Sequence, residues 1–301
     1  MVEQRLHGEQ GQEPSAFATA PRLDRRHPAD AVSTRFTLLF SQIGPMLHAG
    51  LDLLFPPECS FCQVSIETVT RFGLCEDCLS EVSVDCDAEY CSGCGTLSLA
   101  DVFGLSKCPE CDKRDYRFDQ IVPLGLFRGR LRESMIRTKN AGETPLARSI
   151  ALLMGRQLPA KFTNNPPDVV VSIPKYWLKR LVKGTNSAEL LGEQVANILD
   201  VPFFPRALHW TRNIRKQSLL SVTERSRNVR GALKLSSGFD VRDAHVLIVD
   251  DTMTTGATAN EAAAVLKRNG AKRVPVTVAA RASNLDTLDA VDLNRAFANA
   301  S

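Results

Sequence analysis

The chain has 301 residues, about twice the commonest length of a single domain, so one large domain and two smaller domains both fit. Hydrophobic residues make up 44% and charged residues 24% of the sequence. This composition excludes collagen-like, mucin-like and wholly disordered chains, and it supplies enough apolar residues for a hydrophobic core. The formal net charge of +3 is too small to indicate nucleic-acid binding by itself.

Charge is distributed unevenly along the chain. Residues 51–106 contain one basic and ten acidic residues, whereas residues 107–230 contain 23 basic and 11 acidic residues. This asymmetry predicts a boundary between two parts of the chain near residue 110. The basic part suits a nucleic acid or a polyphosphate ligand. Pairing of its cations with the acidic part of the same chain is an equally good interpretation.

The first 55 residues predict a tail followed by a helix. Residues 1–35 are polar, have no hydrophobic period and are predicted to be disordered. Residues 36–55 are apolar enough to consider as a membrane span, but four residues interrupt them, namely Gln42, Pro45, His48 and Asp52. We therefore expect an amphipathic helix that lies on the next domain and no membrane insertion. Because the sequence shows no export signal, we expect a cytoplasmic protein.

Eight of the nine cysteines form four C-x-x-C pairs within residues 56–115. Each pair directs two thiols towards one point, and a second pair about a dozen residues later completes a tetrahedral site of four sulfur ligands. The spacing predicts two such sites, one formed by Cys59, Cys62, Cys75 and Cys78 and the other by Cys91, Cys94, Cys108 and Cys111. The ninth cysteine, Cys86, is expected to be a small, partly buried residue.

Four thiolates at this spacing favour zinc. Iron–sulfur ligation also uses four thiolates, and disulfide bonds would suit an exported protein, so both remain alternatives. Because a four-cysteine site leaves no open coordination position, we expect two structural zinc ions in a double zinc ribbon that serves as a scaffold or docking surface. Few large apolar side chains occur in residues 56–115, so metal binding should supply much of the folding free energy there. We expect the rest of the chain to stay folded without zinc.

Residues 116–281 alternate predicted strands and helices, which indicates an α/β domain with a mostly parallel sheet and helices on both faces. Short runs of β-branched and other apolar residues predict strands over 120–127, 168–173, 245–250 and 274–280. Capping signals and hydrophobic periods predict helices over 128–140, from Thr144 as N-cap, from Asn186 and over 258–269. Asn186 and Glu189 have the spacing of a capping box. Residues 282–301 are predicted to form a C-terminal tail.

The sequence VLIVDDTMTTGAT, over residues 246–258, predicts a phosphate-binding loop. A buried strand ends in Asp250 and Asp251, and a small, hydroxyl-rich turn then leads into a helix. Backbone N–H groups of such a turn, the helix N-terminus and threonine hydroxyls suit a phosphate at the carboxyl end of a parallel strand. Two carboxylates directly before the loop suit sugar hydroxyls, so the pattern indicates a ribose 5-phosphate site. The chain has neither a G-x-x-x-x-G-K-S/T nor a G-x-G-x-x-G motif.

This stretch resembles the motif of type I phosphoribosyltransferases. The order of cysteine pairs followed by that motif resembles the ComF family of competence-associated, amidophosphoribosyltransferase-like proteins. The resemblance covers about residues 45–281 and includes Pro57, Trp177, Gly184, Asn186, Gln217, Leu220, Arg225, Asn228 and Gly231. It implies a type I phosphoribosyltransferase-like sheet preceded by a double zinc ribbon. It also implies binding of 5-phosphoribosyl 1-pyrophosphate, or a related phosphorylated ribose, with magnesium.

The resemblance assigns roles to individual residues. Asp250 and Asp251 would hold the ribose hydroxyls, and the 5-phosphate would lie against Thr252, Met253, Thr254, Thr255, Gly256, Ala257 and Thr258. The pyrophosphate would lie near Ile173, Pro174 and Lys175. Arg225 belongs to residues 212–228, which would cover the site. Where the family typically reads R-G-F-N-Q-A, residues 183–188 read KGTNSA, which leaves the acceptor open.

Two hypotheses about function follow. The first is a phosphoribosyltransferase that displaces pyrophosphate from the ribose, with Lys175 and Arg225 assisting and without a protein nucleophile. His209 is a further acid–base candidate, although surface composition explains it as well. The second is a non-catalytic protein that senses a nucleotide or phosphoribosyl ligand and whose ribbons dock on a partner of the DNA-processing machinery. Direct binding of single-stranded DNA is a variant that the basic segment favours and the low aromatic content of 6% does not.

Overall fold

The structure is a computed structural model. It describes residues 57–65, 70–98, 108–112, 114–140, 142–175, 186–215 and 220–282. The predicted tail over 1–35, the predicted helix over 36–55 and the predicted C-terminal tail from residue 283 onwards lie outside the described residues, as do Trp177, Gly184 and Gln217. All described residues fall within one unit, Pro56–Ser301.

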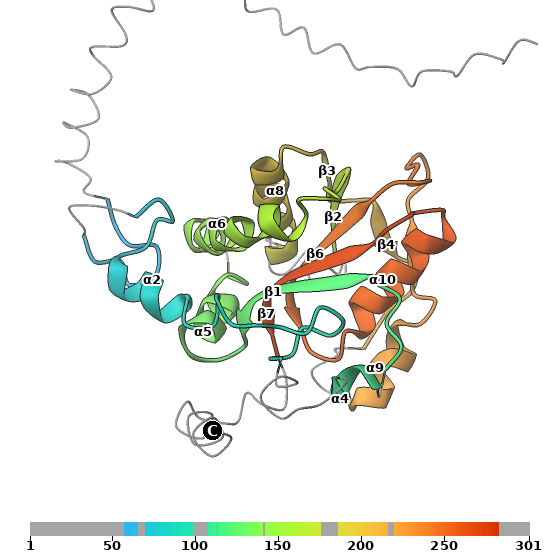
Figure 1. The fold of residues 1–301 in the computed structure, drawn as a ribbon, viewed down its shortest axis with the longest axis horizontal. Coiled ribbons are helices and arrows are strands. Elements are labelled where there is room, and N and C mark those ends of the chain that lie inside the picture. The colour runs from blue at the N-terminus through green and yellow to red at the C-terminus, as the bar shows by residue number, and fades with distance from the viewer. Residues whose placement is uncertain are drawn as a thin grey trace, which may run out of the picture. The chain divides into compact units, whose positions relative to one another are not determined.

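A five-stranded parallel sheet forms the centre of this unit, with the strand order β1-β7-β6-β2-β3 (Figure 1). β4 and β5 pair separately as a two-stranded antiparallel sheet. The strands are β1 (Gln120–Leu126), β2 (Val169–Ser172), β3 (Phe203–Phe204), β4 (Leu208–Trp210), β5 (Leu233–Leu235), β6 (Val246–Met253) and β7 (Pro275–Arg281). Their β-branched and apolar residues suit a sheet that is buried on both faces. The predicted α/β fold with a parallel sheet is confirmed.

Helices cover both faces of the sheet, and alternate residues of a strand serve the two faces. Leu247 and Val249 of β6 belong to the same buried cluster as α6 and α8, whereas Val246 and Ile248 belong to the cluster that contains α10. Figure 1 shows α6 and α8 on one side of the sheet and α10 on the other. The helices are α2 (Glu76–Val82), α4 (Pro109–Asp112), α5 (Gly129–Arg137), α6 (Thr144–Lys161), α8 (Ser187–Leu199), α9 (Val222–Val229) and α10 (Ala257–Arg268). Within the described ranges, none of these helices has the length and hydropathy needed to span a bilayer.

The starts of two helices differ from the predicted caps. α6 begins at Thr144 itself, so Glu143 occupies the N-cap position and Pro145 lies in the first turn. Asn186 is the N-cap of α8, but its side chain makes no capping hydrogen bond. Its Nδ2 instead donates to the carbonyl oxygen of Ile173 at 3.5 Å. The predicted capping box with Glu189 is therefore wrong, because the Asn186 amide is used to tie the helix start to the end of β2.

The first cysteine-rich ribbon shares its hydrophobic core with the helices beside the sheet. Phe61, Phe72 and Leu74 are buried in the same cluster as Leu146 and Ile150 of α6. Leu74 and both α6 residues have no exposed surface. Because these apolar contacts cross from the ribbon to the helix layer, loss of the ribbon would expose the core of the α/β part. We therefore expect unfolding of the ribbon to lower the stability of the sheet, which qualifies the expectation that the rest of the chain stays largely folded without zinc.

Cations of α5 hold the same ribbon in place. Arg128, the N-cap of α5, donates from Nε to Oδ2 of Asp85 at 2.9 Å. The guanidinium groups of Arg130 and Arg137 lie 4.7 Å and 4.9 Å from the ring centroid of Phe61, which is the geometry of a cation–π contact. Figure 1 shows α2 of the ribbon beside α5. For this part of the basic segment, the structure favours pairing within the chain over a surface for nucleic acid.

We expect Leu74→Ala to destabilise the whole described unit by about 2–5 kcal/mol, because it removes a fully buried side chain from the shared core. Val84→Ala is the matched control. Val84 is 70% exposed, so its replacement should change the free energy of unfolding by less than about 0.5 kcal/mol. Urea unfolding followed by circular dichroism and tryptophan fluorescence measures both variants. If the parent unfolded in two separate transitions and Leu74→Ala shifted only the transition of the ribbon, the ribbon would unfold independently of the sheet.

Candidate functional site

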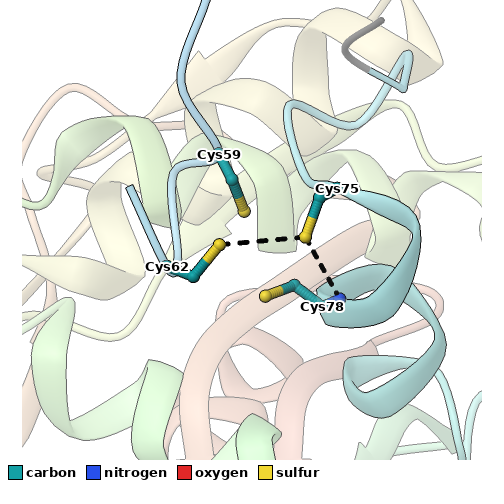
Figure 2. Close-up of side chains that lie close together, drawn as sticks. All are labelled: Cys59, Cys62, Cys75 and Cys78. Atoms are coloured by element: carbon teal, nitrogen blue, oxygen red, sulfur yellow. Dashed lines mark hydrogen bonds between the residues drawn. The ribbon is translucent and has the colours of Figure 1, made fainter. Parts of the chain in front are cut away.

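The eight paired cysteines meet in two groups, as their spacing predicts. The Sγ atoms within each group lie within 4.8 Å of one another, in Cys59, Cys62, Cys75 and Cys78 and in Cys91, Cys94, Cys108 and Cys111. Figure 2 shows the first group, in which the four sulfur atoms point towards a common centre. Cys75 is the N-cap of α2, and its Sγ accepts a hydrogen bond from the backbone N–H of Cys78 at 3.5 Å. The helix start therefore fixes two of the four sulfur ligands.

Both groups have the dimensions of a tetrahedral zinc site. Zn–S bonds of about 2.3 Å place the sulfur atoms about 3.8 Å apart. The Sγ–Sγ distances are 3.8 Å for Cys62–Cys75, 3.6 Å for Cys91–Cys111 and 3.4 Å for Cys94–Cys108. None of the described cysteines forms a disulfide bond. The ninth cysteine, Cys86, lies in the shared core, and burial raises the pKa of its thiol to about 11, which leaves it protonated and unreactive at neutral pH.

We expect the purified protein to contain two zinc ions per chain, because each group supplies a complete four-thiolate shell. Cys62→Ser and Cys108→Ser should each lower the content by one, since each removes a ligand from a different group. Cys86→Ala should keep both ions. Elemental analysis by mass spectrometry measures the content. Less than one zinc per chain, or iron in its place, would contradict the assignment.

The strand that carries the acid pair is longer than predicted. β6 continues through Asp250, Asp251 and Thr252 to Met253, because β7 runs beside it and pairs Thr252 with Ala280. The loop between β6 and α10 therefore consists of residues 254–256 alone. The predicted turn over 252–258 is corrected at both ends, since its first two residues belong to the strand and its last two to the helix.

Gly256 closes this loop as the N-cap of α10. Its φ angle of 75° lies in the left-handed region that favours glycine. A Cβ atom at this position would lie 2.9 Å from Cε1 of Tyr116. Glycine is therefore required here both by the positive φ angle and by the close approach of the Tyr116 ring.

The two acids have different surroundings. Oδ2 of Asp251 accepts a hydrogen bond from Oγ of Ser187, the first residue of α8, at 2.7 Å, and Nζ of Lys139 lies 3.8 Å from the same oxygen. Oδ1 of Asp250 accepts the backbone N–H of Asp251 at 2.8 Å. Burial, and next the charge of Asp251, raise the pKa of Asp250 well above its usual range. A perturbed carboxyl group beside a second carboxylate is typical of a ligand site.

Two threonines add hydroxyl groups to the same strand end. Oγ1 of Thr252 is buried and has no hydrogen-bond partner among the described residues. Oγ1 of Thr254 accepts a hydrogen bond from Nη1 of Arg225 on α9 at 3.0 Å. A buried hydroxyl without a partner is costly, so the Thr252 side chain is suited to a water molecule or a ligand at the end of β6.

The other predicted site residues lie either just after β2 or on β4. β2 is the sheet neighbour of β6, so the Ile173–Lys175 segment leaves the sheet at the same edge as the acid pair. The carbonyl oxygen of Pro174 accepts a hydrogen bond from Nε1 of Trp210 at 2.7 Å, which anchors that segment to β4. Nδ1 of His209 lies 3.1 Å from Oγ of Ser236, and the backbone of His209 pairs with Lys234 of β5. His209 therefore gains no support as an acid–base group.

Three side chains that the sequence analysis missed hold the loop through its carbonyl groups. Nη1 of Arg281 donates to the carbonyl oxygen of Met253 at 3.2 Å and also to that of Thr254. Nη1 of Arg114 and the hydroxyl of Tyr116 donate to the carbonyl oxygen of residue 255 at 3.1 Å and 3.5 Å. These partners are 27 to 141 residues apart in sequence, and no local spacing predicts them.

The hydrogen-bonded carbonyl groups of Met253, Thr254 and Thr255 determine the direction of the N–H groups that follow them in the chain. In a trans peptide the carbonyl of one residue and the N–H of the next point in opposite directions. The N–H groups of Thr254, Thr255 and Gly256 therefore point away from the three side chains that hold the carbonyls. Successive N–H groups that share one side of a turn form an anion-binding concavity.

Comparison with known proteins gives the same order of parts. A double zinc ribbon domain matches residues 50–112, and a phosphoribosyl transferase domain matches residues 185–292. Competence protein F of Haemophilus influenzae is 27% identical over 75% of this chain and 97% of its own length. DNA utilization protein YhgH of Escherichia coli is 28% identical over 74% of this chain and 96% of its own length. The chain belongs to the ComF/YhgH family.

One solved structure that resembles the chain is the glutamine phosphoribosylpyrophosphate amidotransferase of Bacillus subtilis. It is 22% identical, and the similarity covers 48% of this chain and 30% of that chain with a TM-score of 0.33. This similarity is too weak to bear on the fold, which the sheet order and the two family models establish. The phosphoribosyl transferase match includes α8, β6 and the loop, which are the elements that carry the candidate site of this ComF/YhgH family member.

We expect Asp250→Asn to raise the melting temperature at pH 8, because the folded state disfavours the ionised carboxylate that the variant lacks. A carboxyl group with a raised pKa destabilises the fold as the pH rises from about 4 through that raised pKa. The difference in melting temperature between the variant and the parent should therefore shrink as the pH is lowered and vanish near pH 4. Asp240→Asn is the control, and it should change the melting temperature in the opposite direction. Because Arg242 lowers the pKa of Asp240 to about 2, the ionised carboxylate stabilises the fold at pH 8 and its replacement should lower the melting temperature. Identical melting temperatures for Asp250→Asn and the parent at every pH would contradict the assignment.

Proposed function

We propose that the chain binds 5-phosphoribosyl 1-pyrophosphate, or a related phosphorylated ribose, at the carboxyl end of β6 and acts as a type I phosphoribosyltransferase. The proposal is carried by the acid pair Asp250–Asp251 and the loop 254–256, which follow one another at a single strand end. Carboxylates accept hydrogen bonds from sugar hydroxyls, and the loop N–H groups suit a phosphate. The match to a phosphoribosyl transferase domain supports the same ligand class.

Each part of the ligand has its own residues in this proposal. The ribose hydroxyls lie at Asp250 and Asp251, and the 5-phosphate lies at residues 252–258. The pyrophosphate lies near Lys175 and Arg225, with Ile173 and Pro174 supplying backbone. The hydrogen bond from Arg225 to Thr254 holds a guanidinium group beside the 5-phosphate loop, which supports a role for Arg225 in binding a phosphate group of the ligand. Residues 212–228, which include most of α9, cover the bound ligand.

Magnesium would be bound together with the diphosphate of the ligand. Mg²⁺ prefers oxygen ligands and is commonly held by one or two carboxylates plus substrate phosphates. The carboxyl groups of Asp250 and Asp251 fit a nearby cation, because a positive charge would offset the cost of ionising both. When bound, the ion neutralises negative charge on the leaving diphosphate.

The proposed reaction is a displacement at C1 of the ribose. The bond from C1 to the diphosphate oxygen breaks, a bond from C1 to the acceptor forms, pyrophosphate leaves and the acceptor loses its proton to solvent. The transition state resembles an oxocarbenium ion, as at a glycosidic carbon. The acid pair and the loop orient the sugar, Lys175 and Arg225 stabilise the leaving charge, and residues 212–228 exclude water. This scheme needs no protein nucleophile.

A non-catalytic sensor or DNA-processing adaptor is the second candidate function. Two observations favour it. Residues 183–188 depart from the sequence that the resemblance implies on the acceptor side, and two relatives are named a competence protein and a DNA utilization protein. In this case the same site binds the phosphoribosyl or nucleotide ligand, and the chain docks on a DNA-processing protein or on single-stranded DNA.

The double variant Asp250→Asn with Asp251→Asn should weaken binding of magnesium phosphoribosyl pyrophosphate by about 3–6 kcal/mol. The loss corresponds to two charge-assisted hydrogen bonds of about 1.5–3 kcal/mol each. Isothermal titration calorimetry measures it. The matched control, Asp240→Asn with Asp243→Asn, changes two acids outside the site and should bind like the parent. Equal affinity of the Asp250/Asp251 variant and the parent would place the ligand site elsewhere.

Magnesium-dependent pyrophosphate release distinguishes the two candidates. A transferase should release pyrophosphate with at least one acceptor from a panel of ammonia, amines and nucleobases, and the Asp250/Asp251 variant should not. A parent protein that binds the ligand tightly and never releases pyrophosphate with any acceptor would favour the sensor.

A further inference from the structure

The second cysteine group lies on the sheet directly beside the phosphate loop. Its first knuckle, residues 91–95, is bonded to β1 through the N–H of Ile121, which donates to the carbonyl oxygen of Ser92 at 2.8 Å. Gly95 has a φ angle of 73°, and a Cβ atom there would lie 3.1 Å from Cδ1 of Ile121 and 3.5 Å from Cδ of Arg281. The knuckle is thus packed closely against the last residue of β7.

Arg281 connects this knuckle to the loop. The side chain is among the largest that are fully buried, with 2% exposed surface. Nε donates to the carbonyl oxygen of Cys94 at 2.8 Å, while Nη1 donates to the carbonyl oxygens of Met253 and Thr254. Because the guanidinium group is planar and rigid, a donor on one edge fixes the direction of the others. The position of Cys94 therefore bears on the direction of the carbonyls of Met253 and Thr254, at the end of β6 and the start of the loop.

The segment that follows the second cysteine group makes another connection. Arg114 lies just after Cys111, and its Nη2 is 3.9 Å from Oε2 of Glu110 in α4, between the last two cysteines. Arg114 and Tyr116 both donate to the carbonyl oxygen of Thr255. The ring of Tyr116 also occupies the space beside Gly256. The carbonyls of Met253, Thr254 and Thr255 are thus held by side chains that contact the second group or follow it directly in the chain.

The charge of Arg281 strengthens this link. Its hydrogen-bond acceptors among the described residues are all backbone carbonyls. A buried guanidinium group needs compensating negative charge. Four thiolates around one zinc ion carry a net charge of about −2, and Arg281 is bonded to the backbone of one of those ligands, Cys94. Zinc loading therefore supplies negative charge next to the buried cation.

We propose that the second zinc site is a positioning element of the ligand site. Zinc held by Cys91, Cys94, Cys108 and Cys111 fixes the residues that hold the loop carbonyls, namely Arg281, Arg114 and Tyr116. These residues in turn direct the loop N–H groups towards the ligand. The part of this inference that concerns ligand affinity rests on the proposed function, whereas the part that concerns loop order does not. The first zinc site packs against α5 and α6, and in the described part of the chain no donor from its ribbon reaches the carbonyls of residues 253–255, so we expect it to lack this role.

The first test breaks the link and leaves the cysteines intact. Arg114→Gln combined with Tyr116→Phe should loosen the loop, and Arg117→Gln is the matched control because its side chain is 64% exposed. Hydrogen exchange of ligand-free protein is measured on the peptide over residues 253–261, where the N–H of Asn260 donates to the carbonyl oxygen of Gly256 at 2.8 Å. Exchange there should speed up by about tenfold in the double variant only, with zinc content unchanged. Unchanged exchange in the double variant would overturn the proposal.

The second test compares the two zinc sites directly. Cys62→Ser and Cys108→Ser should each lose one zinc ion, but only Cys108→Ser should speed up exchange over residues 253–261 by more than it speeds up exchange in β2. A general loss of stability through the core that the first ribbon shares with the sheet would instead affect both segments alike. Calorimetric titration with magnesium phosphoribosyl pyrophosphate should show affinity lowered by about tenfold in Cys108→Ser and in the Arg114/Tyr116 variant. Equal effects of the two cysteine variants on the loop would overturn the proposal. If the parent binds no phosphoribosyl pyrophosphate while loop exchange still depends on the second zinc site, the proposed function fails and the positioning role stands.

Discussion

Parallel pairing of β6 with β2 on one side and β7 on the other is the constraint on which the candidate site depends. In a parallel sheet all carboxyl ends lie at one edge, so groups carried by three strands are brought together there. The register pairs Met253 with Arg281, which places the guanidinium group beside the start of the loop. β2 delivers the Ile173–Lys175 segment to the same edge. The acids, the loop and the buried cation thus meet without any long-range loop having to fold over the sheet.

The two cysteine-rich ribbons serve the sheet in different ways. The first contributes Phe61, Phe72 and Leu74 to the core on the α6 side and is held by cations of α5. The second is bonded to β1 and reaches the loop through side chains. In the proposed arrangement, metal binding is linked to packing at the first ribbon and to the geometry of the candidate ligand site at the second.

Local sequence patterns predicted those features that depend only on residues close together in the chain. The cysteine groups follow from C-x-x-C spacing, and the acid pair and loop follow from a strand, two acids and a small turn in immediate succession. The length of β6 could not be read in this way, because its last residues are strand only through pairing with β7. Ser187 and Lys139 at Asp251, and Arg281 at the loop, were missed because tertiary packing alone brings them there. The capping box failed because the Asn186 amide has a tertiary partner in Ile173.

The core shared by the first ribbon and α6 limits how such a chain could evolve. Many two-part proteins exchange their parts freely, because each part buries its own apolar surface and the linker tolerates change. Here the apolar face of the first ribbon and that of α6 are one surface, so neither could be traded for an unrelated module without exposing the other. A lineage that lost its cysteines would have to refill the volume of Phe72 and Leu74 at the same time. The ribbon and the sheet are thus expected to be inherited as a single unit.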